Sequence, residues 1–232
     1  MRLRPALLAC LLLSPLAPVA AAPGDAALVS ASEASGFTRT GRYEEVGRLC
    51  AAFAARWPQA VRCFDFGTTP EGRPLHAMAI STSGALDPAA ARARGLPVVL
   101  IQGGIHPGEI DGKDAGSLVA RQLLEGKRAK GTLDKVVWLF VPVFNADGHE
   151  RFGPWNRPNQ RGPEEMGFRA TAQNLNLNRD YMKADAPEMQ AMLALVDAWD
   201  PLIAMDLHVT DGAKFRHDIS VQVEPSHEGD PT

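Results

Sequence analysis

The sequence has few aromatic residues, few cysteines and no marked excess of either charge. Of its 232 residues, 6% are aromatic, two are tyrosine and three are cysteine. Lysine and arginine together number 24, against 27 aspartates and glutamates, which gives a formal net charge of −3. Nothing in this balance indicates a nucleic-acid partner or attraction to an anionic membrane surface. With 45% hydrophobic and 22% charged residues, the composition is that of an ordinary globular protein with one sizeable core.

The chain begins with an apolar stretch that is too short to span a membrane. Arg2 and Arg4 precede a nearly uninterrupted apolar run at 6–13, and small alanines stand at 20–22. A spanning helix needs roughly 20 apolar residues, whereas this layout is typical of a cleaved secretory signal peptide. We therefore expect residues 1–22 to be removed. The mature protein is then secreted or periplasmic, with no membrane attachment after cleavage.

Export changes how the remaining cysteines are interpreted. Cys10 would leave with the signal peptide, while Cys50 and Cys63 would remain. An oxidising compartment permits a disulfide between them. The alternative is that both are small buried hydrophobic residues. No second cysteine pair accompanies them, so a cysteine metal site is not indicated.

Helical and strand-like segments alternate along the chain. This alternation predicts an α/β fold with a mixed, mostly parallel sheet flanked by helices. The expected helices are 43–56, 109–124 and 187–199, and the expected strands are 61–67, 74–81, 98–102, 136–143 and 202–207. We expect the apolar strands at 98–102, 136–143 and 202–207 to be buried.

Three polar residues follow three of the predicted strands. His106 comes after the strand at 98–102, Asn145 after the next strand, and His208 after the strand at 202–207. Asn145 also opens the stretch Asn-Ala-Asp-Gly, which we interpret as a turn. In open α/β sheets, binding sites form at the carboxyl ends of the strands. We therefore expect these side chains to belong to one site.

Two of these residues, with Glu109, form a possible metal-ligand set. Two histidines and one glutamate are a known ligand set for catalytic zinc. The stretch from His106 to Glu109 reads His-Pro-Gly-Glu, which also suits a turn with a helix-capping carboxylate. His208 alone would be read as a histidine at a strand end. His149 and His217 are spare candidates, and we expect both to be exposed.

The stretch Gln-Asn-Leu-Asn-Leu-Asn-Arg at 173–179 is unusual because asparagine is depleted in strands. If it is extended, Leu175 and Leu177 share one face. Asn178 and Arg179 would then present hydrogen-bond donors at its end, and arginine is suited to bidentate capture of a carboxylate. The alternative is a polar edge strand or a loop.

The order of these motifs resembles that of the carboxypeptidase A-like zinc carboxypeptidases. His-x-x-Glu follows one strand, Asn-x-Asp-Gly follows the next, Asn-Arg comes later, and a histidine follows a further apolar strand. Gly-Arg-Pro-Leu at 72–75 also resembles an early hairpin of that family. The resemblance covers residues 36–217. It implies hydrolysis of C-terminal peptide bonds, one zinc ion per chain, and a peptide or peptide-like substrate with a free C-terminal carboxylate.

The resemblance also assigns roles by position. His106, Glu109 and His208 match the zinc ligands, and Asn178 and Arg179 match the pair that holds the substrate carboxylate.

A further arginine of that family polarises the scissile carbonyl. Arg169 stands nine residues before Asn178, a spacing seen in the regulatory branch of the family, and it is our choice for this role. Arg157 and Arg161 are rivals, because the pancreatic branch uses a longer spacing.

The sequence departs from the family pattern in two places. Asn176 stands where the family usually has an aspartate that orients the first zinc histidine, and an amide raises ligand basicity less than a carboxylate. The family's general base is a glutamate far downstream of the last zinc histidine, preceded by a tyrosine. Only 209–232 follow that histidine here, and Glu224 and Glu228 lie in a polar tail at 218–232. We therefore expect the C-terminal strands of the domain to be missing.

Two other functions stay open at this stage. A zinc amidohydrolase or deacylase could use the same ligands on a non-peptide amide. A non-catalytic zinc-binding protein would need no general base.

Overall fold

The computed structural model describes residues 24–210 and 212–223. The predicted signal peptide at 1–22, together with Glu224 and Glu228, lies outside these residues. Within the described ranges, no helix is both long and apolar enough to cross a membrane.

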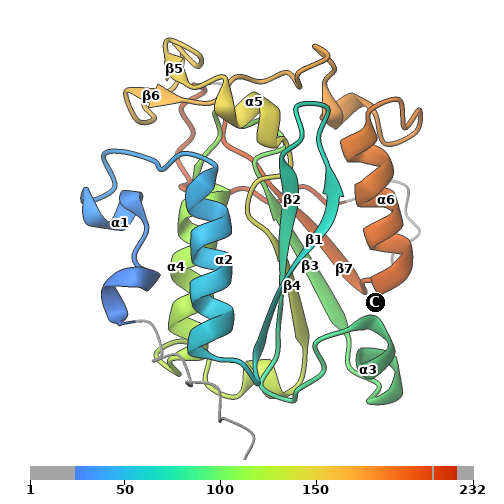
Figure 1. Cartoon of the computed structure of the whole chain (residues 1–232). Helices are drawn as coiled ribbons and strands as arrows, with labels where there is room; N and C mark the ends of the chain where they lie inside the picture. The colour runs from blue at the N-terminus through green and yellow to red at the C-terminus, as the bar shows by residue number, and fades with distance from the viewer. Residues whose placement is uncertain (1–23, 211, 224–232) are drawn as a thin grey trace, which may run out of the picture.

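A five-stranded mixed sheet forms the centre of the molecule, as predicted (Figure 1). Its order is β1-β2-β4-β3-β7. The pairs β1–β2 and β2–β4 are antiparallel, while β4–β3 and β3–β7 are parallel. The strands are β1 (Val61–Thr68), β2 (Pro74–Ile80), β3 (Val98–Gly103), β4 (Val137–Val141) and β7 (Ile203–Leu207).

Helices cover both faces of the sheet (Figure 1). The helices α2 (Glu44–Arg56) and α4 (Asp111–Leu124) lie on one face, and α6 (Pro187–Trp199) lies on the other. The buried side chains of β4 pack alternately against the helices on the two faces, since successive strand side chains point to opposite faces of the sheet. Trp138 and Phe140 pack toward α2 and α4, whereas Leu139 packs toward α6.

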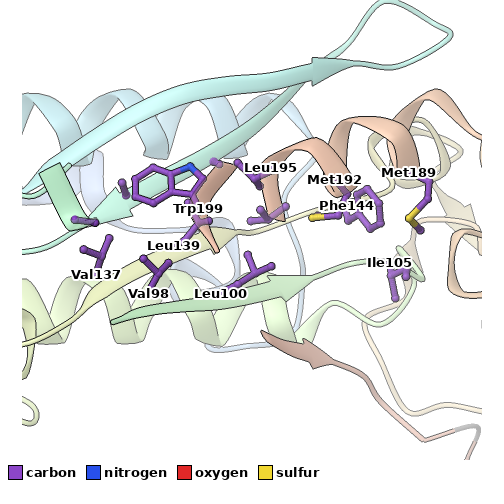
Figure 2. Close-up of a cluster of buried hydrophobic side chains, with 14 of the residues drawn as sticks. Val98, Leu100, Ile105, Val137, Leu139, Phe144, Met189, Met192, Leu195 and Trp199 are labelled. Carbon is purple, nitrogen blue, oxygen red and sulfur yellow. The ribbon is translucent and has the colours of Figure 1, made fainter. Parts of the chain in front are cut away.

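The larger core cluster lies between α6 and the parallel strands. Figure 2 shows α6 contributing Met189, Met192, Leu195 and Trp199, which are all buried. They meet apolar side chains from β3 and β4, which are Val98, Leu100, Val137 and Leu139. This packing fixes the parallel strands, whose carboxyl ends carry the candidate site.

Cys50 and Cys63 form a disulfide, which decides between the two readings of these cysteines. The bond joins α2 to β1, and the two Cα atoms are 5.4 Å apart. It therefore links one covering helix to the antiparallel side of the sheet.

The strand predicted at 202–207 is present as β7, but the expectation that it is buried is wrong. β7 ends the sheet order and pairs only with β3 within the described residues. Leu202 is 74% exposed, Ile203 51% and Met205 44%. An apolar edge strand of this kind invites pairing with further chain.

The remaining elements are short, and the sequence pattern did not indicate them. They are η1 (Asp25–Leu28), α1 (Ala31–Ala34), α3 (Pro88–Ala93), η2 (Thr132–Asp134), α5 (Ala146–Glu150), β5 (Gly153–Pro154), β6 (Glu165–Met166) and η3 (Leu177–Arg179). The turn expected at 145–148 is instead the start of α5, for which the Asn145 side chain accepts a hydrogen bond from the Gly148 N–H at 2.9 Å.

Candidate metal centre

The carboxyl ends of β4, β3 and β7 meet, as the sequence predicted, because these strands are adjacent and parallel. His106 follows β3 and His208 follows β7. Asn145 follows β4, but its side chain has a different task. Its amide also donates to the Arg169 carbonyl at 3.2 Å. Asn145 therefore fixes the loop that carries Arg169 and does not join the ligand cluster.

A tight turn, and not a helix, brings Glu109 to His106. The Glu109 N–H donates to the His106 carbonyl oxygen at 2.9 Å, and α4 begins only at Asp111. Gly108 permits the close packing around this turn. A Cβ at that position would lie 2.5 Å from Cγ of Arg157 and 2.9 Å from the Gly167 carbonyl oxygen. The turn is thus fitted against the loop that follows α5.

His106, Glu109 and His208 bring one potential ligand atom each to within 4.8 Å of one another. Nδ1 of His106 lies 3.0 Å from Oε1 of Glu109, and Nδ1 of His208 lies 3.0 Å from Oε2. The Val209 N–H donates to the same Oε2 at 2.9 Å. His106 and Glu109 are buried, whereas the His208 side chain is 36% exposed. The cluster is therefore closed on one side and open on the other.

Hydrogen bonds within the cluster favour the charged forms of Glu109 and His208. Burial opposes ionisation of Glu109, but hydrogen bonds from His106, His208 and the Val209 backbone outweigh it. The pKa of the Glu109 carboxyl therefore lies well below its usual range. Hydrogen bonds to Asp206 and Glu109 raise the pKa of His208 to about 10.

The donor set fits zinc. It consists of two imidazoles and one ionised carboxylate, the ligand set of catalytic sites that keep one coordination position open. The buried Nε2 of His106 has no hydrogen-bond partner, whereas Nδ1 of both rings faces Glu109. Within residues 24–210 and 212–223, this cluster is the one group of three or more histidine, cysteine, aspartate or glutamate side chains that are close enough together to hold an ion.

The three candidate arginines occupy different places. Nη2 of Arg157 lies 2.9 Å from Oε1 of Glu109, and this side chain is 6% exposed. Nη1 of Arg169 lies 4.0 Å from the same oxygen, with 36% of the side chain exposed. Arg161 lines a neighbouring cleft of about 230 Å³, beside Val209. Arg157 is therefore buried against the ligand carboxylate, whereas Arg169 is farther from it and more exposed.

Asn178 and Arg179 lie on η3, so the extended interpretation of 173–179 is wrong. Leu177 is fully buried and anchors this short helix in the core. Asn176 precedes the helix, and its side chain accepts from the Asn178 N–H at 3.1 Å. Arg179 is exposed and donates to the Asn178 carbonyl oxygen at 2.7 Å. The alternating leucines thus serve the core without forming a strand.

With this geometry established, comparison with known proteins decides the family. A profile of the zinc carboxypeptidase family matches residues 46–215. This chain belongs to that family. Carboxypeptidase B of Helicoverpa zea is 27% identical over 170 residues, which are 66% of this chain and 38% of that protein. The inactive metallocarboxypeptidase ecm14 of Schizosaccharomyces pombe is 35% identical over 88 residues, which are 36% and 18% of the two chains.

Solved structures of the same class share the fold. A metallo-carboxypeptidase from Burkholderia cenocepacia aligns with a TM-score of 0.56 at 22% identity, covering 75% of this chain and 42% of that one. The carboxypeptidase A of Helicoverpa armigera aligns with a TM-score of 0.57 at 21% identity, covering 73% and 46%. This chain therefore spans less than half the length of these relatives.

One expectation about the spare histidines is wrong. His217 is exposed, as predicted, but His149 is only 1% exposed. Its ring lies on α5 near the rings of Tyr43 and Phe152. Nδ1 is 3.6 Å from Oε1 of Glu150, within ion-pair distance but beyond hydrogen-bond distance, so neither ring nitrogen has a hydrogen-bond partner. His149 is a core residue and not a ligand.

Burial lowers the pKa of His149 to about 4, which predicts a pH-dependent stability. The unfolded side chain has a pKa of about 6.5. The stabilisation is complete above about pH 6.5 and is lost as the pH falls toward 4, because only the unfolded chain then gains this proton. Between these two pKa values, the free energy of unfolding changes by up to about 1.4 kcal/mol per pH unit. The free energy of unfolding is measured by urea denaturation at several pH values for wild-type and His149→Phe protein, both with chelator present. It should depend less steeply on pH in the variant. Equal slopes would contradict this account.

Two aspartates support the site in ways that the sequence motifs did not indicate. Asp147 on α5 is buried and accepts hydrogen bonds from Thr69, Glu71 and Arg73, which lie in the turn between β1 and β2. It therefore fastens the predicted hairpin to the end of β4. Oδ2 of Asp206 lies 2.9 Å from Nε2 of His208. Asp206 lies in β7 and His208 directly after it, and a spacing of two in extended chain places both side chains on one face.

Proposed function

We propose that this chain carries the zinc-binding half of a metallocarboxypeptidase that hydrolyses C-terminal peptide bonds. The observation that carries the proposal is the convergence of His106, Glu109 and His208 within 4.8 Å at adjacent strand ends. His106, Glu109 and His208 would hold one zinc ion per chain. Bound zinc would polarise the scissile carbonyl and lower the pKa of a bound water to about 7.

Arg169 is proposed to stabilise the charge that develops on the carbonyl oxygen. Its side chain is 36% exposed and its Nη1 lies 4.0 Å from Oε1 of Glu109, so it borders the open side of the cluster. A cation placed where charge develops is worth more in a partly desolvated site than in water. Arg157, already bonded to Glu109, would instead keep that carboxylate oriented.

Asn178 and Arg179 are proposed to select a free C-terminal carboxylate. Arg179 is exposed on η3, and its fork of N–H groups matches a carboxylate bidentately. The position beside it offers the Asn178 amide, which is half-buried. The substrate would therefore be a peptide or peptide-like molecule with an unblocked C-terminus.

A non-catalytic zinc-binding role is the second candidate. One observation favours it, since a relative that is 35% identical over 88 residues is named an inactive metallocarboxypeptidase. A zinc amidohydrolase acting on a non-peptide amide would share the ligand set but would have no use for Arg179.

Export is proposed as the setting of this function. The charged start, short apolar run and alanine-rich end of residues 1–22 support cleavage and release into a secreted or periplasmic space. The disulfide between Cys50 and Cys63 supports an oxidising compartment.

A matched pair of peptides tests the proposed substrate class. The two are identical except that one has a free C-terminal carboxylate and the other a C-terminal amide. Zinc-loaded protein should bind the free form more tightly, by at least about tenfold, because the charged contact is worth roughly 1.5–3 kcal/mol. Arg179→Ala should remove the difference. Arg94→Ala, which removes an exposed arginine between the end of α3 and the amino end of β3, should leave it intact. Equal binding of both peptides by the wild-type protein would instead support the amidohydrolase.

A further inference from the structure

The two histidines of the metal centre have unequal surroundings on the side away from Glu109. Nε2 of His106 is buried and has no hydrogen-bond partner. Nε2 of His208 lies 2.9 Å from Oδ2 of Asp206. The two rings therefore differ in what holds them, although their Nδ1 atoms lie at equal distances from Glu109.

Burial explains why the two rings need different support. The His106 side chain is 4% exposed, so packing alone restricts its rotation. The His208 side chain is 36% exposed and stands just beyond the end of β7, where packing restricts it less. A hydrogen bond to Nε2 supplies the restraint that packing does not.

The asparagine at 176 does not provide the missing partner for His106. Its side-chain oxygen accepts from the Asn178 N–H at 3.1 Å, where it caps η3. Among the described residues, the carboxylate that bonds a ligand histidine on its outer nitrogen is that of Asp206.

The strand fixes the backbone of Asp206, while Oδ1 of its carboxylate is buried without a hydrogen-bond partner. Asp206 lies within β7, in register with Gln102 of β3, and its side chain is 27% exposed. Gln102 is buried and donates to the Tyr181 hydroxyl at 2.8 Å. A strand residue carries its side chain in a fixed direction, which is what an orienting group requires.

We propose that Asp206 is a positioning residue of the metal centre, holding the proton of His208 on Nε2 and thereby directing the Nδ1 lone pair toward the metal. This inference rests on the proposed zinc site. An imidazole has one protonated and one free nitrogen when neutral, and a carboxylate bonded to one nitrogen selects the tautomer and raises the basicity of the other.

The experiment compares zinc affinity in Asp206→Ala, Asp206→Asn and a matched control, Asp197→Ala, which removes an exposed aspartate of α6. Dissociation constants are measured by competition with a chelator. Thermal unfolding of each chelator-treated protein serves as a check on folding. Asp206→Ala should bind zinc about 10–100-fold more weakly. Asp206→Asn, which keeps an acceptor oxygen of the same shape, should retain more affinity, and the control should match wild type.

A second readout separates positioning from a general structural role. Cobalt substituted for zinc reports ligand geometry through its visible absorption, and Asp206→Ala should shift that spectrum while Asp197→Ala leaves it unchanged. Wild-type zinc affinity in both Asp206 variants, with zinc lost in His106→Ala, would overturn the inference and leave the zinc site standing. Full zinc retention in His106→Ala would overturn the zinc site itself.

Discussion

The zinc-loaded 232-residue chain is expected to release C-terminal residues far more slowly than a version extended to the length of its relatives. Peptide hydrolysis needs a group that takes a proton from water and delivers it to the leaving amine. Such general acid–base help is typically worth about 10²–10⁴ in rate. The family resemblance implies that a glutamate downstream of the last zinc histidine serves as this general base. Among the described residues, the carboxylates of Glu109 and Asp206 are each engaged with a histidine.

The comparison requires that both proteins bind equal amounts of zinc, so that the difference reports chemistry and not metal content. The measurement is the rate of C-terminal residue release at saturating peptide. If the short chain matched the long one, a general base would exist within residues 1–232. Glu224 and Glu228, which lie outside the described residues, would then be the first positions to substitute.

His106→Ala is expected to remove stoichiometric zinc, and His208→Ala is expected to do the same. Each substitution leaves two of the three protein ligands, and the groups that hydrogen-bond to the ligands do not replace a lost imidazole. The zinc content of protein purified through a chelating step, measured by metal analysis, should fall from one zinc per chain in the wild type to near zero in each variant.

Two histidines outside the cluster provide matched controls. His217 is exposed and His149 is buried, and neither lies in the cluster. His217→Ala and His149→Phe should therefore keep one zinc per chain. Loss of zinc in the controls, or its retention in both ligand variants, would refute the ligand assignment.

The sequence predicted most of the fold because burial leaves a strong periodic signal. The helix at 187–199 agrees with α6 at both ends, and the strands around the central core were found within a few residues. The exposure of β7 was not predictable in this way. An apolar strand looks the same whether or not something covers it, and coverage depends on chain that is not adjacent in sequence.

The site was predictable in its ligands and less so in its supporting contacts. Order along the chain indicated His106, Glu109 and His208, because strand ends of a parallel sheet converge. His149 was expected to be exposed, but packing beside the rings of Tyr43 and Phe152 buries it. The Leu-Asn alternation at 173–179 imitates a strand, yet hydrogen bonds from asparagine side chains to the backbone favour turns and caps over strands.

The central claim is that zinc binds at the junction of β3 and β7. The most direct test is a crystal structure of zinc-loaded protein with anomalous diffraction measured at the zinc edge. We expect one strong peak per chain, about 2.0–2.2 Å from Nδ1 of His106, Nδ1 of His208 and a carboxylate oxygen of Glu109. A peak at other side chains, or no peak in protein shown to contain zinc, would contradict the central claim.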